Sequence, residues 1–288
     1  MTMKDILSKS TGRHYIESID PYAMEVEAEF DVPVDFDGLN KKVWTETQDG
    51  SLMHFGREFI SRGPFSLVRL AGSLSALFEL TPFKENYLQS PRTSTHVHVN
   101  ILNWTKDELL TVLTAYYILE PLLFTFCAKG RSSNLFCLPL HLAENGAKPV
   151  TEIIEGKYQN LIDRFDNYKY AALNVCNVAK IGTIEFRHFQ GTKKADDIIK
   201  WLSIIDRVCN VRNLYPNAKA VWKAYTNNRL GFAKAILGKD LDLTREDLYE
   251  LLDANYSIVF DIVFHTPKKQ PPKAYTFATE LELDNLEN

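Results

Sequence analysis

Two stretches of the chain alternate between apolar and polar residues. In residues 22–32 the apolar side chains alternate with acidic ones: Met24, Val26, Ala28 and Phe30 against Glu25, Glu27 and Glu29. In residues 94–101 they alternate with imidazole and amide groups: Val97, Val99 and Ile101 against His96, His98 and Asn100. A period of two places successive side chains on opposite faces of a strand. Each stretch therefore predicts a strand with one apolar and one polar face.

Further strands are predicted on the same grounds. In Thr183–Thr192 we expect Ile184, Phe186 and His188 on one face, and Glu185, Arg187 and Phe189 on the other. Residues 170–178 read as the partner of this strand, with a turn near Lys180–Gly182. A turn at Asp49–Gly50 leads into a short strand that runs through His54 to Ile60.

Helical spacing governs most of the remaining chain. Apolar residues three and four apart predict helices over residues 67–78, 105–127 and 196–209, the second opened by a capping box at Thr105–Glu108. Two more helices are expected at 216–237 and from the box at Thr244–Asp247 to Tyr256. Strands and helices do not alternate in βαβ order, so the pattern predicts an α+β fold: a curved, mainly antiparallel sheet with helices packed on its outer face.

Composition adds bounds to this picture. The 288 residues are 45% apolar with a net charge of -4, which gives no global attraction to nucleic acid or to an anionic membrane. Four widely spaced cysteines without a CxxC pair suit the reduced thiols of a cytoplasmic protein, and we find no secretory signal or membrane-spanning run. We expect an N-terminal segment (1–21), a main domain (22–265) and a loosely held acidic tail (266–288).

The polar faces carry the candidate chemistry. From a single strand, a solvated face is the ordinary interpretation, but three strands here offer carboxylates, histidines and one arginine. Clustered carboxylates repel one another unless a cation lies between them, and Mg²⁺ or Mn²⁺ prefers such oxygen ligands. The pair His96 and His98 alone suits a structural role equally well. The cupin pattern is incomplete because no Glu follows His98 closely, and we find no Walker A loop, GxGxxG, HExxH or GxSxG motif.

Six short motifs follow one another along the chain: ExEF at 27–30, DGSL with GREFIS at 49–61, HVHVN at 96–100, RSSN at 131–134, YAALN at 170–174 and TIEFRxFxGT at 183–192. In this order they resemble the motifs of the phage and bacterial amidoligases, within the glutamine synthetase and glutamate-cysteine ligase superfamily of carboxylate-amine ligases. The resemblance covers about residues 22–210.

The resemblance implies a glutamine synthetase-like catalytic domain over 22–265. In it ATP phosphorylates a carboxylate, and an amine then attacks the acyl phosphate. The substrates would be a small-molecule or peptide carboxylate and an amine. Matching motif positions imply three sets of residues: Glu27, Glu29, Glu58, His96 and Glu185 for Mg²⁺ or Mn²⁺; His96, His98, Asn100 and Asn174 for the nucleotide; Arg187, Glu185 and Arg131 for catalysis.

Several positions carry a competing interpretation. We expect Glu25 to be solvated and Asp49 to shape its turn, while Arg131 and Asn174 suit a loop and a turn as well as a site. Ala23 and Met24 depart from the family, which tends to have glycine there. Two other functions remain open: a metal-dependent phosphotransferase acting on a guanidino-type acceptor, and a non-catalytic binding protein on the same scaffold.

Overall fold

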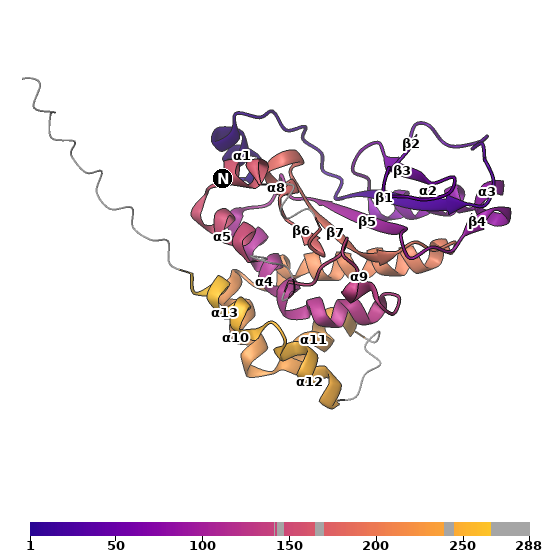
Figure 1. Ribbon diagram of the computed structural model, residues 1–288. Helices are drawn as coiled ribbons and strands as arrows, with labels where there is room; N and C mark the ends of the chain where they lie inside the picture. Colours follow the sequence, from indigo (N-terminus) through magenta and orange to yellow (C-terminus); the bar gives the residue numbers. More distant parts are fainter. Residues whose placement is uncertain (141, 143–146, 165–169, 239–244, 266–288) are drawn as a thin grey trace, which may run out of the picture.

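A computed structural model describes residues 1–140, 142, 147–164, 170–238 and 245–265 (Figure 1). Its strands are β1 (Tyr22–Phe30), β2 (Trp44–Thr47), β3 (Arg57–Ser61), β4 (Tyr87–Leu88), β5 (Ser94–Asn100), β6 (Leu173–Asn174) and β7 (Thr183–Gln190). They form one sheet in the order β2-β3-β1-β5-β7-β6, with β4 paired to β1, and each pairing is antiparallel. The predicted α+β class is confirmed.

The long helices lie on the apolar side of this sheet, and those near the C-terminus extend away from it (Figure 1). Those along the first two thirds of the chain are α1 (Met3–Thr11), α2 (Leu67–Phe78), α3 (Thr81–Glu85), α4 (Lys106–Leu123), α5 (Lys148–Glu155), α6 (Tyr158–Asp163) and α8 (Asn177–Ile181), with short 3₁₀ turns η1 (Phe124–Phe126) and η2 (Arg131–Ser133). The later ones are α9 (Ala195–Leu214), α10 (Ala218–Asn227), α11 (Arg229–Leu237), α12 (Arg245–Asp253) and α13 (Tyr256–Val263).

The core forms between the sheet and the layer of α2, α4 and α9. Met24, Val26, Val97 and Val99 are almost fully buried. Tyr116 of α4 packs edge-on against Phe186 of β7, with ring centroids 5.6 Å apart. This packing leaves the opposite face of β1, β5 and β7 for the polar side chains.

Helix α4 runs through the centre of this core. The predicted capping box is present, because Thr105 and Glu108 each accept a hydrogen bond from the other's backbone nitrogen. By length and composition the segment Lys106–Phe126 could cross a membrane, but 72% of its most apolar window is buried inside the fold. Pro121 cannot donate to the carbonyl of Tyr117, and Asn255 Nδ2 supplies that bond at 2.9 Å.

Three predicted elements were wrong in extent. Residues 170–178 are not one strand: Asn174 accepts a bond from the backbone of Cys176 in a tight turn, and α8 follows. The strand expected from His54 begins at Arg57, since His54 has a positive φ of 51°. The helix expected over 216–237 is broken at Asn228, whose side chain caps α11.

Other expectations fall outside these observations. The tail and Thr244 lie outside the described residues, and the domain boundaries stay a prediction. The N-terminal segment, expected only as a polar stretch, contains α1, which has its own capping box at Thr2 and Asp5.

Candidate metal and active site

The site is built from neighbouring rungs of the antiparallel sheet. Glu27 pairs with Glu58 across β1 and β3, and Glu25 pairs with His96 across β1 and β5. His98 pairs with Glu185 across β5 and β7. Side chains opposite one another on the same face lie within about 5.5 Å at Cβ. Register alone therefore gathers residues that are up to 160 positions apart in the sequence.

One group of ligand atoms lies at the centre of the sheet. His96 Nδ1 is 2.9 Å from Glu25 Oε2 and 3.3 Å from Glu185 Oε1. On its other side, His96 Nε2 is 2.7 Å from the hydroxyl of Ser94. Glu25, His96 and Glu185 offer atoms that all lie within 4.8 Å of one another, which is close enough to share one cation. We call these three residues the central group.

A second group lies nearer the β3 side of the sheet. Glu27, Asp49 and Glu58 also bring one oxygen each to within 4.8 Å of the others. Glu27 is held in place by the backbone nitrogen and hydroxyl of Ser94, both at 2.8 Å from Oε2. We call these three residues the lateral group. Two oxygen-rich groups with a single imidazole between them fit Mg²⁺ or Mn²⁺ better than a thiophilic metal.

The charges of the site are unbalanced without a cation. Burial raises the pKa of Glu58 to about 8, with further contributions from the nearby carboxylates, Glu25 and Glu27 first. Burial alone would also raise the pKa of Glu25, but hydrogen bonds from His96 and His98 hold it well below its usual value. A proton on Glu58 is thus the substitute for a missing positive charge in the lateral group.

The orientation of Glu185 is fixed by three donors. Its Oε2 accepts bonds from Asn174 Nδ2 at 2.8 Å and from Asn177 Nδ2 at 2.7 Å. Its Oε1 is 2.5 Å from Nη1 of Arg187. Burial opposes the charged form of Glu185, but Arg187 and the two histidines keep its pKa below the usual value. Glu185 is therefore held as a carboxylate facing His96.

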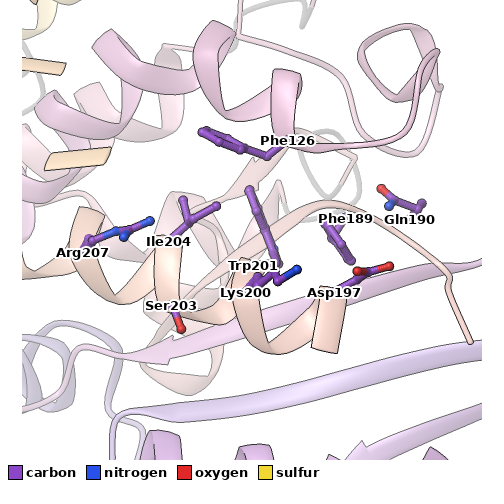
Figure 2. Close-up of a pocket in the computed structure, with 9 residues that line it drawn as sticks. All are labelled: Phe126, Phe189, Gln190, Asp197, Lys200, Trp201, Ser203, Ile204 and Arg207. Atoms are coloured by element: carbon purple, nitrogen blue, oxygen red, sulfur yellow. The ribbon is translucent and has the colours of Figure 1, made fainter. Parts of the chain in front are cut away.

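A β-bulge decides on which face of the sheet Phe189 lies. Three residues of β5, from Thr95 to Val97, face four of β7, from Phe186 to Phe189. The extra residue ends the alternation, so Phe189 does not share the face of Arg187 as predicted. Its ring instead stacks on Trp201 of α9 at 5.5 Å, and Figure 2 shows it beside Trp201 on the helix side.

Arg131 binds the backbone of this bulge. It is only 5% exposed, and its guanidinium donates to the carbonyls of His188 at 2.8 Å and Arg187 at 2.7 Å. Its side chain thus contacts the backbone of β7, outside both groups of ligand atoms. We assign it a positioning role in place of the catalytic one expected from its motif.

Replacing Arg131 with Met should loosen the bulge and leave two carbonyls short of a donor. We expect the free energy of unfolding to fall by about 3 kcal/mol, the scale of charge-assisted buried bonds. Urea unfolding followed by circular dichroism measures this, with Lys129→Met as the control in the same loop. A loss below about 0.5 kcal/mol would show that the bulge does not depend on Arg131.

The structure brings most of the predicted site residues together and places Glu29 and Asn100 elsewhere. It brings Glu27, Glu58, His96, His98, Glu185 and Arg187 together, with Asn174 behind Glu185. Glu29 lies apart, with Oε1 accepting a bond from the backbone of Met53 at 2.7 Å. Asn100 donates to the carbonyl of Ser18 at 2.9 Å and so anchors the N-terminal segment.

Three residues of the site escaped the sequence prediction. Glu25 was expected to be solvated, yet it contacts both His96 and His98. Asp49 shapes its turn as expected, accepting a bond from Ser51, but also belongs to the lateral group. Glu25 and Asp49 carried a visible signal in the acidic alternation and the DGSL motif. Asn177 carried none, because α8 was not foreseen.

A cavity of about 360 Å³ opens beside the central group. Its walls include Glu25, His98, Lys180, Glu185 and Arg187. We call it the reaction cavity. Another cavity, of about 510 Å³, lies on the helix side between η1 and α9 (Figure 2), and Asp197 is its only acidic lining residue among those described.

The metal-free protein should lose stability as the pH rises. The pKa of Glu58 is about 8 in the folded protein, above its ordinary value of 4.5. The stabilisation that comes from protonated Glu58 is therefore complete below pH 4.5. That contribution disappears as the pH passes through 8. We expect the melting temperature without metal to fall more between pH 6 and 8.5 in the wild type than in Glu58→Gln.

Saturating Mg²⁺ should remove this difference, since bound metal replaces the proton. Differential scanning fluorimetry in chelated and Mg²⁺-loaded buffers tests both statements, with the exposed Glu79→Gln as a matched control. Parallel pH profiles for wild type and Glu58→Gln would contradict the assignment of Glu58 to the lateral group.

Comparison with known families covers the centre of the chain. Residues 84–209 match the sequence profile of a family described as "Putative amidoligase enzyme". The matched segment carries His96, Glu185 and Arg187, and the expected amidoligase resemblance is confirmed there. The match begins at residue 84, after β1 and β3 along the chain. Glu25, Glu27 and Glu58 therefore lie outside the matched segment, and the fold brings them to the site. A comparison with curated proteins finds no match.

Proposed function

We propose, from the match of residues 84–209 to the amidoligase family, that the chain is an ATP-dependent carboxylate-amine ligase working through an acyl phosphate. The observation that carries this proposal is the convergence of five carboxylates, an imidazole and a guanidinium on one face of the sheet. Such a set suits the binding of a polyphosphate through divalent cations.

The two groups of ligand atoms define which residues would hold the ions. Glu25, His96 and Glu185 would hold one Mg²⁺ or Mn²⁺, and Glu27, Asp49 and Glu58 another. When bound, these ions would neutralise the charge of the ATP phosphates and of the transferring phosphoryl group. The raised pKa of Glu58, caused by burial and neighbouring carboxylates, supports this need for positive charge.

The chain's own side chains would orient the two chemical steps. In the first, an oxygen of the substrate carboxylate attacks the γ-phosphorus of ATP, the bond to the bridging oxygen breaks, and ADP leaves. In the second, the amine attacks the acyl carbon, inorganic phosphate leaves with the electron pair of the C–O bond, and the nitrogen loses a proton. Arg187 opens onto the reaction cavity, where its planar guanidinium would bind either the phosphoryl oxygens or the carboxylate.

Product analysis tests this proposal. A panel of carboxylates should be incubated with ATP, Mg²⁺ and hydroxylamine, an amine small enough to reach any acyl phosphate. The ligase reaction releases equal amounts of ADP, phosphate and hydroxamate. ADP released together with a stable phosphorylated acceptor, and no hydroxamate, would instead identify a phosphotransferase.

A further inference from the structure

A larger cavity adjoins the reaction cavity on the side of the N-terminal segment. It measures about 580 Å³ and shares His98, Lys180 and Ile181 with the reaction cavity, which measures about 360 Å³. We call it the distal cavity. A volume of this size is within the range that proteins use for ligands of drug-like size. A single molecule could thus lie in the distal cavity and present one end to Glu185 and Arg187.

The distal cavity is basic, although the chain as a whole is acidic. Arg62, Lys180 and His14 contribute basic side chains to its lining. Glu17 is its only acidic lining residue among those described, and its Oε2 is 3.1 Å from Nζ of Lys4. Since the net charge of the chain is -4, this local excess of positive charge favours an anionic group.

Part of the wall of the distal cavity is apolar. Ile16 and Ile181 stand on its lining with 84% and 51% of their surfaces exposed, and Leu102 and Pro64 complete this wall. On the sheet, Ala23 pairs with His98 and leaves space where a larger side chain would fill the cavity. A ligand that fits has an apolar body as well as a negative charge.

The nucleotide would lie on the other side of the site, away from His98 and Asn100, which were expected to contact it but line the distal cavity. Along β1, Ala23 lines the distal cavity, Glu25 belongs to the central group and Glu27 to the lateral group, so the central group lies between the distal cavity and the lateral group. If the phosphates of ATP lie over the two groups with the reacting end at Arg187, the adenosine is directed away from the distal cavity. The distal cavity is then left to the second substrate.

Resting on the proposed function, we infer that the distal cavity binds the body of the carboxylate substrate, and that this substrate is an extended acid with an apolar middle and a second anionic group at its far end. Arg62 is the residue that recognises the far anion. A protonated amine would be repelled by the same basic residues, which assigns the cavity to the acid.

Calorimetric binding of octanedioate and octanoate tests this inference without requiring turnover. The two acids share chain length and differ only in the second carboxylate. With Mg²⁺ and ADP present, wild-type protein should bind octanedioate at least tenfold more tightly than octanoate. Arg62→Gln should remove this preference and leave octanoate binding unchanged, whereas Arg229→Gln, a matched loss of charge on α11, should behave as wild type.

Each result has a defined meaning. The inference would be overturned if the wild type bound both acids equally or bound neither, or if Arg62→Gln kept the preference for octanedioate. It would also be overturned if Arg62→Gln bound ADP more weakly and octanedioate as tightly as the wild type. Failure of the ligase proposal would appear separately, as an absence of hydroxamate from every acid. Ala23→Leu provides a second check: it should lose octanedioate binding by at least tenfold and still bind Mn²⁺.

Discussion

Replacing Glu185 with Gln should lower ATP-dependent product formation by about 1,000-fold, which corresponds to about 4 kcal/mol of lost transition-state stabilisation. The substituted amide is nearly isosteric, so Asn174 and Asn177 can still donate to its oxygen. Its nitrogen would then face Arg187 and His96 where a carboxylate oxygen lies now. The central group would lose a negative ligand and gain a donor beside a guanidinium.

Steady-state ADP release with saturating Mg²⁺ measures this effect. Glu79→Gln is the control, because Glu79 lies at the surface and pairs only with Lys84 among the ion pairs described. Mn²⁺ titration of Glu185→Gln separates lost metal affinity from lost chemistry. Activity of Glu185→Gln within threefold of the wild type would remove Glu185 from the catalytic centre.

Changing Arg187 to Lys should reduce the turnover number by about 100-fold while the fold stays intact. The charge is kept, but an ammonium group cannot form the paired, planar bonds that a guanidinium offers to a carboxylate or phosphoryl group. A single ammonium must also divide its donors between Glu185 and the substrate. We expect kcat to fall more than the affinity for ATP, because the contact strengthens as charge is transferred.

Chemical rescue makes this prediction sharper. Arg187→Ala should be nearly inactive and should regain activity when guanidinium is added at millimolar concentration, whereas Glu185→Gln should not. Arg229→Lys on α11 is the matched control. A turnover number for Arg187→Lys equal to that of the wild type would mean that Arg187 only stabilises Glu185.

The sheet could be predicted because its strands keep a strict period of two over most of their length. Once one face of β1, β5 and β7 is apolar, the other face follows, and antiparallel register brings Glu27, His96 and Glu185 close together. Most of the site therefore follows from local alternation.

The remaining features depend on tertiary contacts. The bulge in β7 inserts one residue without changing the composition of the strand, and Arg131 reaches it from a loop more than 50 residues earlier. The alternation therefore predicts Arg187 correctly and misplaces Phe189. Helix α8 is short and begins three residues after the end of β6, so Asn177 could not be foreseen as a partner of Glu185.

Glu25 shows a different limit. Its place at the edge of the acidic run suggested solvent exposure, whereas its pairing with His96 brings it between two histidines. The neighbouring strand decides which carboxylates of the acidic run in β1 can share a cation. The sequence of that run alone does not contain this information.

Counting bound divalent cations tests the central claim most directly. Electron paramagnetic resonance of free Mn²⁺ should show about two ions bound per chain in the wild type with a non-hydrolysable ATP analogue. Glu185→Gln and Glu58→Gln should each retain about one, and Glu79→Gln about two. Binding in the Glu58→Gln/Glu185→Gln double variant that equals wild type, or no binding in the wild type, would contradict the claim that these carboxylates converge to hold metal ions.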